Sequence, residues 1–221
     1  MNASTTRLKI WDLPTRLFHW VLVVLVGLAW WSVSVHNLTL HRICGSLVAG
    51  LLAFRLWWGL FGGSTARFAA FLKGPGAVLS YARGLFGHAE PAAGHNPMGG
   101  WSVAALLSLL IAIVGFGLFA VDVDGLESGP FSNLVSFEVG RTASHLHDLM
   151  FDGLKLLVLV HLAAILFYAV VKREGLVRAM VDGKKPLPET ATPLAPARIW
   201  ALIVGLVIGA GVAAVLIRLS N

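Results

Sequence analysis

The chain has 221 residues, of which 57% are hydrophobic and only 13% are charged. Soluble domains are typically about 45–50% apolar and roughly 25% charged, so this composition argues against a soluble protein. The formal net charge of +6 would suit a nucleic-acid partner, but the basic residues flank apolar segments, which indicates membrane topology instead. We therefore expect no nucleic-acid binding. The length suits one bundle of four or five membrane spans.

The single cysteine, Cys44, excludes several ways of holding a cofactor. One cysteine cannot provide an intrachain disulfide, a CxxCH haem attachment site with its two thioether links, a four-cysteine iron–sulfur cluster or a cysteine-based zinc site. Any haem must therefore be held by coordination and packing alone. Cys44 itself is expected to be a small apolar packing residue.

Five apolar segments, each close to the ~20 residues that cross a bilayer core, are predicted to be transmembrane helices. In chain order they are Leu17–Val35, His41–Phe61, Met98–Val121, Leu146–Val171 and Ile199–Ile217. The first is too long for the core of a signal peptide and has no small-residue cleavage site, so we expect it to be retained. Asp12 and Asn96 are the predicted N-caps of the first and third helices. The predicted fold class is an all-α membrane protein.

Loop charges predict the orientation of the chain. The N-terminal tail, the loop 62–97 and the segment after residue 171 are rich in Lys and Arg, whereas the loop between the third and fourth helices is acidic. In a bacterial inner (plasma) membrane, the positive-inside rule then places the N-terminus in the cytoplasm and the C-terminus in the periplasm. The amphipathic piece Phe68–Phe86 is expected on the cytoplasmic membrane surface, and Lys184–Pro196 is expected to be a linker.

Four of the eight histidines fall in three of these helices: His19, His41, His147 and His161. Histidine at membrane depth is costly unless it faces the bundle interior and has a partner. His147 and His161 are fourteen residues apart, which is about 21 Å along a helix and within roughly 40° of one face. His145 would lie about 160° from that face, so we expect it outside the interior stripe.

Predicted depth pairs His41 with His147 near the outer face, and His19 with His161 near the cytoplasmic face. Each pair is a candidate set of axial ligands for the iron of one non-covalent haem b. Bis-histidine ligation fills both axial positions, which suits electron transfer and disfavours oxygen binding. The alternative, that each histidine is hydrogen-bonded in helix packing, stays open.

Haem propionates need cationic or donor partners, and Arg42 and Arg55 are the candidates for this role. Arg42 follows His41 directly. Arg55 lies in the cytoplasmic half of the second helix, where snorkelling to the inner headgroups is an equal alternative. The remaining histidines are expected to be solvated in loops: His36, His88 and His95.

Motifs along most of the chain carry a family resemblance. They are Trp-Asp-Leu-Pro-Thr-Arg-Leu-Phe-His-Trp at 11–20, His-Arg at 41–42, Arg-Leu-Trp-Trp-Gly at 55–59 and Gly-His-Asn-Pro-Met-Gly at 94–99, together with the His147/His161 pair. On these motifs, residues 8–186 resemble the bacterial cytochrome b561 family, which includes the b-type cytochrome subunits of nickel–iron hydrogenases. The resemblance implies a four-helix transmembrane bundle that binds two haems b through His19, His41, His147 and His161. Residues 187–221, a linker and a fifth C-terminal helix, lie outside that core.

The expected function is that of a transmembrane di-haem cytochrome b that passes electrons between a periplasmic or membrane redox partner and the quinone pool. A cytochrome c or a dehydrogenase or hydrogenase subunit is the expected protein partner. Two alternatives stay open: a membrane-anchor subunit of a dehydrogenase or hydrogenase complex, and a histidine-containing proton channel or transporter without haem. The sequence also leaves open the oligomeric state, and whether the chain is itself a quinone oxidoreductase or a subunit of one.

Overall fold

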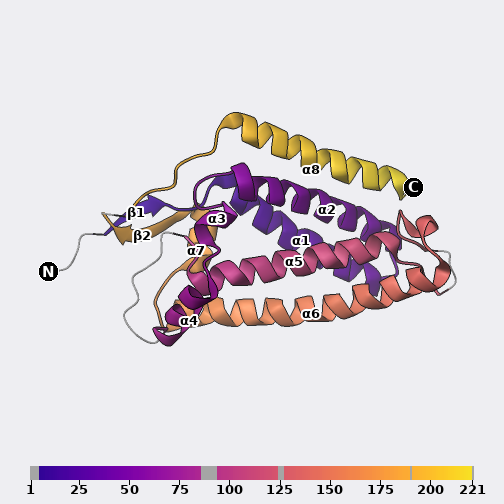
Figure 1. Cartoon of the computed structure of the whole chain (residues 1–221), viewed down its shortest axis with the longest axis horizontal. Helices are drawn as coiled ribbons and strands as arrows, with labels where there is room; N and C mark the ends of the chain where they lie inside the picture. The colour runs from indigo at the N-terminus through magenta and orange to yellow at the C-terminus, as the bar shows by residue number, and fades with distance from the viewer. Residues whose placement is uncertain (1–4, 86–93, 124–126, 190, 221) are drawn as a thin grey trace. The chain divides into compact units, whose positions relative to one another are not determined.

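The computed structural model describes residues 5–85, 94–123, 127–189 and 191–220 (Figure 1). Five helices in these ranges are long and apolar enough to cross a membrane. They are α1 (Leu13–Ser34), α2 (Leu38–Phe61), α5 (Pro97–Phe119), α6 (Phe137–Val170) and α8 (Ile199–Leu219). The predicted all-α membrane fold is confirmed, and each long helix lies within a few residues of its predicted position except at the start of α6.

Contacts divide the chain into two compact units, which are described separately. The first comprises Met1–Leu17, Leu56–Ala105 and Val160–Ile203, and the second comprises Phe18–Arg55, Leu106–Leu159 and Val204–Asn221. Every long helix contributes residues to both units. Three of the four membrane histidines belong to the second unit, whereas His161 belongs to the first.

Two side-chain caps start helices where the sequence predicts them. The Oδ1 atom of Asp12 accepts the Thr15 N–H at 2.8 Å, and its Oδ2 atom accepts the indole N–H of Trp58 at 3.1 Å. Asn96 caps α5 in the same way, because its Oδ1 atom accepts the Gly99 N–H at 2.7 Å. An N-cap oxygen satisfies a backbone N–H that has no partner within the helix. Both N-cap predictions are confirmed.

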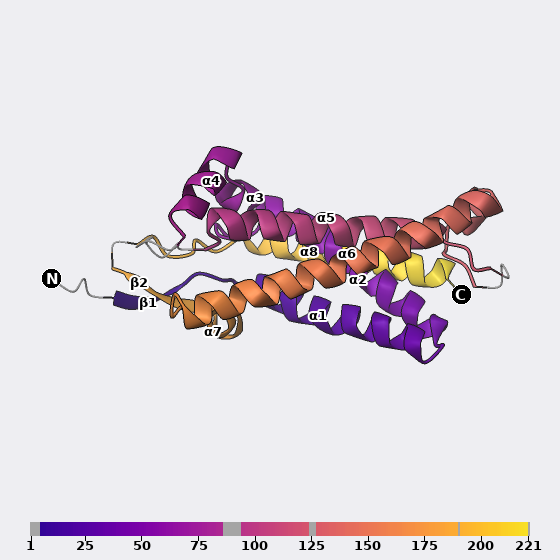
Figure 2. The ribbon, with the colours of Figure 1, turned by 90° about the horizontal axis from the view of Figure 1, so that it is seen from below.

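The fourth long helix, α6, begins at Phe137 rather than at the predicted Leu146 and continues without a break to Val170 (Figure 2). Its first turn follows Ser136, whose carbonyl accepts the Gly140 N–H at 2.9 Å. Gly140 is buried and faces Val121 so closely that a side chain would not fit there. Hydropathy does not detect this start because the first turns are polar.

A short antiparallel sheet replaces part of the predicted linker. Strand β1 (Thr5–Lys9) pairs with β2 (Lys184–Pro188), with Arg7 opposite Pro186 (Figure 1). The prediction that Lys184–Pro196 is a linker is therefore wrong over its first five residues. The reason is an alternating burial pattern in β2, where Lys185 and Leu187 are buried and Pro186 between them is exposed. Proline is tolerated in β2 because the strand has only one neighbour.

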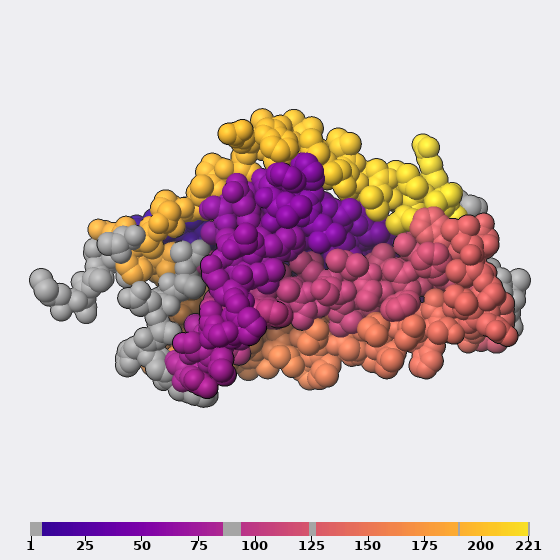
Figure 3. Space-filling view, viewed as in Figure 1, coloured from indigo at the N-terminus to yellow at the C-terminus, as the bar shows by residue number. Residues whose placement is uncertain are grey.

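The amphipathic piece predicted over Phe68–Phe86 contains two short helices. Helix α3 (Phe68–Phe71) ends at Leu72, and α4 (Pro75–Arg83) starts after Gly74. The second helix begins with a proline at its first position, which is a favourable place for that residue. Phe86 lies outside the described residues. Figure 3 shows the segment from α3 to α4 on the surface of the molecule.

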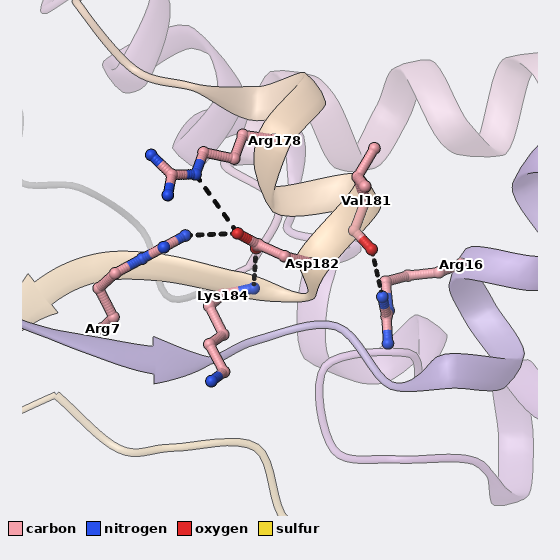
Figure 4. Close-up of polar contacts among 6 residues, drawn as sticks. All are labelled: Arg7, Arg16, Arg178, Val181, Asp182 and Lys184. Atoms are coloured by element: carbon pink, nitrogen blue, oxygen red, sulfur yellow. Dashed lines mark hydrogen bonds and ion pairs between the residues drawn. The ribbon is translucent and has the colours of Figure 1, made fainter.

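Asp182 joins three parts of the first unit at the end of α7 (Leu176–Asp182), as Figure 4 shows. Its carboxylate accepts the Lys184 N–H at 2.8 Å and forms ion pairs with Arg7 at 2.6 Å and with Arg178 at 3.4 Å. The Lys184 hydrogen bond is the largest cause that lowers the pKa of Asp182, and the two guanidinium groups add to it. All of these partners favour the charged form of the carboxylate.

We expect the pairing of β1 with β2 to weaken at low pH through Asp182. Because the pKa of this carboxyl is lower in the folded state, its stabilisation is complete above the unfolded value of about 3.9. It is lost as the pH falls through the lower, folded value. Hydrogen exchange of residues 5–9, corrected for intrinsic rates, measures this loss. In Asp182→Asn the acid-dependent part should disappear, and an unchanged pH profile in that variant would contradict the assignment.

Within the second unit, α8 packs on α2 through glycines. A Cβ atom on Gly50 would lie 2.5 Å from the Gly209 carbonyl oxygen and 2.9 Å from the Ala213 Cβ. A Cβ on Gly209 would in turn lie 2.9 Å from the Gly50 oxygen. Small residues that let two backbones approach closely are typical of helix packing in membranes. The fifth helix is thus attached to α2 at a definite place.

Candidate functional site

A cavity of about 580 Å³ lies within the second unit, among α1, α2, α5 and α6. Its walls are largely apolar, and His41 from α2 and His147 from α6 both line it. Sites for small molecules and cofactors typically enclose about 300–1,000 Å³ behind apolar walls with a few polar groups. The cavity therefore has the size and the lining of a cofactor site.

The rings of His41 and His147 lie edge-on to one another in this cavity. Their centroids are 5.9 Å apart and their planes are inclined at 77°. A metal–imidazole bond is about 2.0–2.1 Å long, so two imidazoles on opposite sides of one metal have centroids roughly 6 Å apart. The observed separation is the one that a pair of axial ligands needs.

Backbone carbonyls hold both rings through Nδ1. The Nδ1 atom of His41 lies 3.0 Å from the Ala29 oxygen on α1, and that of His147 lies 2.8 Å from the Ile113 oxygen on α5. A carbonyl can only accept, so each Nδ1 carries the proton and Nε2 keeps its lone pair. A carbonyl that accepts the Nδ1 proton is usual for histidines that bind metals, because it fixes the tautomer and raises the basicity of the ligand.

The structure distinguishes His147 from His145 as the helical angle predicts. His147 is half-buried and lines the cavity, whereas His145 is exposed. His147 therefore lies on the cavity face of α6 and His145 does not, and the ligand role of His147 stays a prediction.

A porphyrin fits this donor set better than a bare metal ion does. Among the described residues, no group of three or more His, Cys, Asp or Glu side chains is arranged to hold a metal ion. Protein-only sites usually need three or four such ligands. A porphyrin brings four nitrogens of its own and needs only two axial imidazoles. Haem therefore fits the residues that are present.

Several charged residues line the cavity. Arg42 forms an ion pair with Glu127, and Arg141 donates to the Val121 oxygen at 3.0 Å. Lys155, which also lines the cavity, pairs with Asp152 at 2.6 Å. Glu127 is absent from the sequence-based site because its loop has no recognisable motif. Its contact with Arg42 depends on the folding of that loop, in which Val121 and Ser128 form an isolated bridge.

Arg55 is fully buried, with 2% of its surface exposed, and its guanidinium lies 6.0 Å from the centre of the Phe18 ring. This burial contradicts the alternative of snorkelling, because a snorkelling side chain would keep its charged end exposed. Burial of a charge is costly without compensation, and buried charges in membrane proteins usually serve a function. Arg55 therefore remains a candidate partner for a haem propionate.

The inner pair of histidines is not brought together by the described geometry. His19 packs edge-on against the neighbouring Trp20, with centroids 4.8 Å apart, and it belongs to the second unit. His161 is half-exposed and belongs to the first unit. Their pairing therefore stays a prediction.

The other histidines divide into one that agrees with expectation and one that does not. His36 is exposed in the turn between α1 and α2, with a positive φ of 56°. His95, which was expected to be solvated, is half-buried, with its ring 4.5 Å from that of Trp11 and 4.7 Å from that of Phe71. His88 lies outside the described residues.

Comparison with known families matches residues 10–183 to the family model of prokaryotic cytochrome b561. The chain belongs to this cytochrome family. Membership establishes a multi-pass membrane protein that binds haem b and transfers electrons within the membrane. The match ends before α8, so the fifth helix lies outside the family core. No curated protein and no solved structure matches this cytochrome b561-family chain.

Proposed function

We propose that the protein is a di-haem cytochrome that carries electrons across the membrane, and that the outer haem lies between His41 and His147. The observation that carries this proposal is the pair of opposed imidazoles, 5.9 Å apart, each with its Nδ1 engaged by a carbonyl. Haem b, when bound, supplies reversible one-electron transfer at its iron. Two axial histidines leave no open position for oxygen.

The inner haem is proposed to lie between His19 and His161. Two arguments support it: the separation of about 21 Å between His147 and His161 along α6, and the implication of the family resemblance. Two cofactors at these depths would divide the membrane crossing into two shorter steps.

Arg42 and Arg55 are the proposed partners of the propionates. Arg42 lines the cavity beside His41 and is only partly exposed, so its charge is weakly screened. A charge-assisted bond from such a guanidinium to a carboxylate is stronger than a neutral hydrogen bond. Arg55 is buried at the other end of α2, where it would serve the inner haem. Its burial favours a permanent counter-charge nearby.

The proposed partners are quinone in the lipid phase and a redox protein at the periplasmic face, either a cytochrome c or a dehydrogenase or hydrogenase subunit. The family's role in electron transfer and the charge pattern of the loops support this arrangement. The pattern places the N-terminus in the cytoplasm and the C-terminus in the periplasm of an inner membrane. Residues 8–186 would form the electron-carrying domain, and 187–221 an added segment.

Haem counting tests the proposal. The purified protein should show a b-type α-band in its reduced-minus-oxidised spectrum and contain two haems per chain, both extractable without breaking a covalent bond. Pyridine haemochrome assay against amino-acid analysis measures the ratio. One haem per chain would exclude the di-haem arrangement, and a colourless protein would favour the channel or transporter alternative.

A further inference from the structure

Helix α5 has no histidine, yet two of its residues touch His147. The Ile113 oxygen accepts the Nδ1 proton of His147 at 2.8 Å. Gly117 lies one turn further on the same face of α5. A Cβ atom on Gly117 would lie 3.0 Å from Nδ1 and 3.1 Å from Cε1 of that ring. The Ile113 carbonyl thus holds the ring against α5, and the ring can lie this close because Gly117 has no side chain.

The backbone at Gly117 is held from its other side. A Cβ atom on Gly129, in the loop after α5, would overlap the carbonyl oxygens of Gly117 and Leu118. The Gly129 N–H also donates to the Ala120 oxygen at 2.8 Å, and the Phe131 N–H donates to the Leu118 oxygen at 2.8 Å. These contacts fix this end of α5 against the loop, so its backbone cannot easily move away from His147. A side chain added at Gly117 therefore requires the ring of His147 to shift by a few tenths of an ångström.

We propose that Gly117 is a positioning residue for the outer haem and that it sets the plane of the His147 ring nearly perpendicular to that of His41. This inference rests on the proposed ligand role of the two histidines. The angle of 77° between the planes is the geometric observation. If the planes of the two imidazoles are perpendicular, each ring would interact mainly with a different one of the two dπ orbitals of a bound haem iron. The energies of these two orbitals would then stay nearly equal. The oxidised haem then gives a strongly axial low-spin electron paramagnetic resonance (EPR) signal with an unusually large maximum g value.

Gly117→Ala tests the proposal, with Gly115→Ala as the matched control. The control makes the same change on the same helix, two residues away, where a Cβ atom would meet nothing within 4 Å. In the oxidised Gly117→Ala protein, the maximum g value of the outer haem should shift, because the ring turns and its bond to Ile113 weakens. The midpoint potential of that haem should shift as well, since the bond tunes the basicity of the ligand. The signal of the inner haem and the whole spectrum of Gly115→Ala should stay unchanged.

Equal spectra of wild type and Gly117→Ala would overturn the proposal, as would an equal shift in both glycine variants. His147→Gly separates this failure from a failure of the proposed function. If His147 is a ligand, that variant loses the outer EPR signal whether or not Gly117 positions the ring. If both EPR signals survive in His147→Gly, the ligand assignment itself is wrong.

A double variant covers the case in which Gly117→Ala does not retain the outer haem. Free imidazole, supplied together with haem b to His147→Gly, can coordinate without a tether and can shift away from a new side chain. It should restore the outer signal both in His147→Gly and in His147→Gly/Gly117→Ala. If the signal returned in His147→Gly but not in His147→Gly/Gly117→Ala, the alanine at position 117 would disturb the haem site itself and not only the His147 ring. That result would overturn the proposal.

Discussion

Replacing His147 with alanine should halve the haem content, from two haems per chain to one. The physical reason is that the outer iron loses one of two protein bonds, while the single cysteine, Cys44, cannot supply the two thioether links that would retain the cofactor covalently. The empty ligand position also lies in a largely apolar cavity. His41→Ala should have the same effect. The haem ratio and the amplitude of the b-type α-band measure the loss.

His145→Ala is the matched control for this experiment. The two histidines lie on the same helix two residues apart, but only His147 lines the cavity and His145 is exposed. The control should therefore keep both haems. If His145→Ala loses a haem and His147→Ala keeps two, the outer ligand assignment is wrong.

Gly209→Val in the fifth helix should destabilise the protein. The new side chain would meet the Gly50 oxygen at 2.9 Å and the Phe54 Cβ at 3.2 Å, so α8 would have to move away from α2. Overpacking of this kind typically costs about 1–3 kcal/mol. Thermal unfolding in detergent, followed by the helical circular dichroism signal, measures the change.

Gly211→Val is the control, since a Cβ atom at Gly211 meets nothing within 4 Å. It makes the same change in helix propensity two residues away. The difference between the two variants therefore isolates the contact of α8 with α2. Equal stabilities would show that the glycine contact contributes nothing to the attachment of α8.

Helices could be predicted from the sequence because lipid leaves a spanning backbone no alternative, so an apolar run of ~20 residues is sufficient evidence. The same criterion misses what lies outside the apolar runs. The polar start of α6 at Phe137 depends on Val121 packing against Gly140. Strand β2 depends on pairing with β1, which is more than 170 residues away in the chain, and local composition carries no sign of it.

In the candidate site, too, some features could be predicted from the sequence and others could not. Helical angle alone selects His147 over His145, because both belong to one regular element. The Ala29 and Ile113 carbonyls that hold the two rings could not be predicted, since every residue has a carbonyl and only the helix packing selects one. Likewise, Gly115 and Gly117 look alike in the sequence. The structure separates them, because only Gly117 lies against His147.

Electron transfer across a sealed membrane tests the central claim most directly. Vesicles that contain the protein and entrapped ferricyanide are given ascorbate outside, and the absorbance of ferricyanide is followed. Wild type and His145→Ala should bleach it much faster than protein-free vesicles, whereas His147→Ala should fall to the protein-free rate because one of its two haems is gone. Bleaching by His147→Ala as fast as by wild type would contradict a transmembrane path through the cavity between His41 and His147.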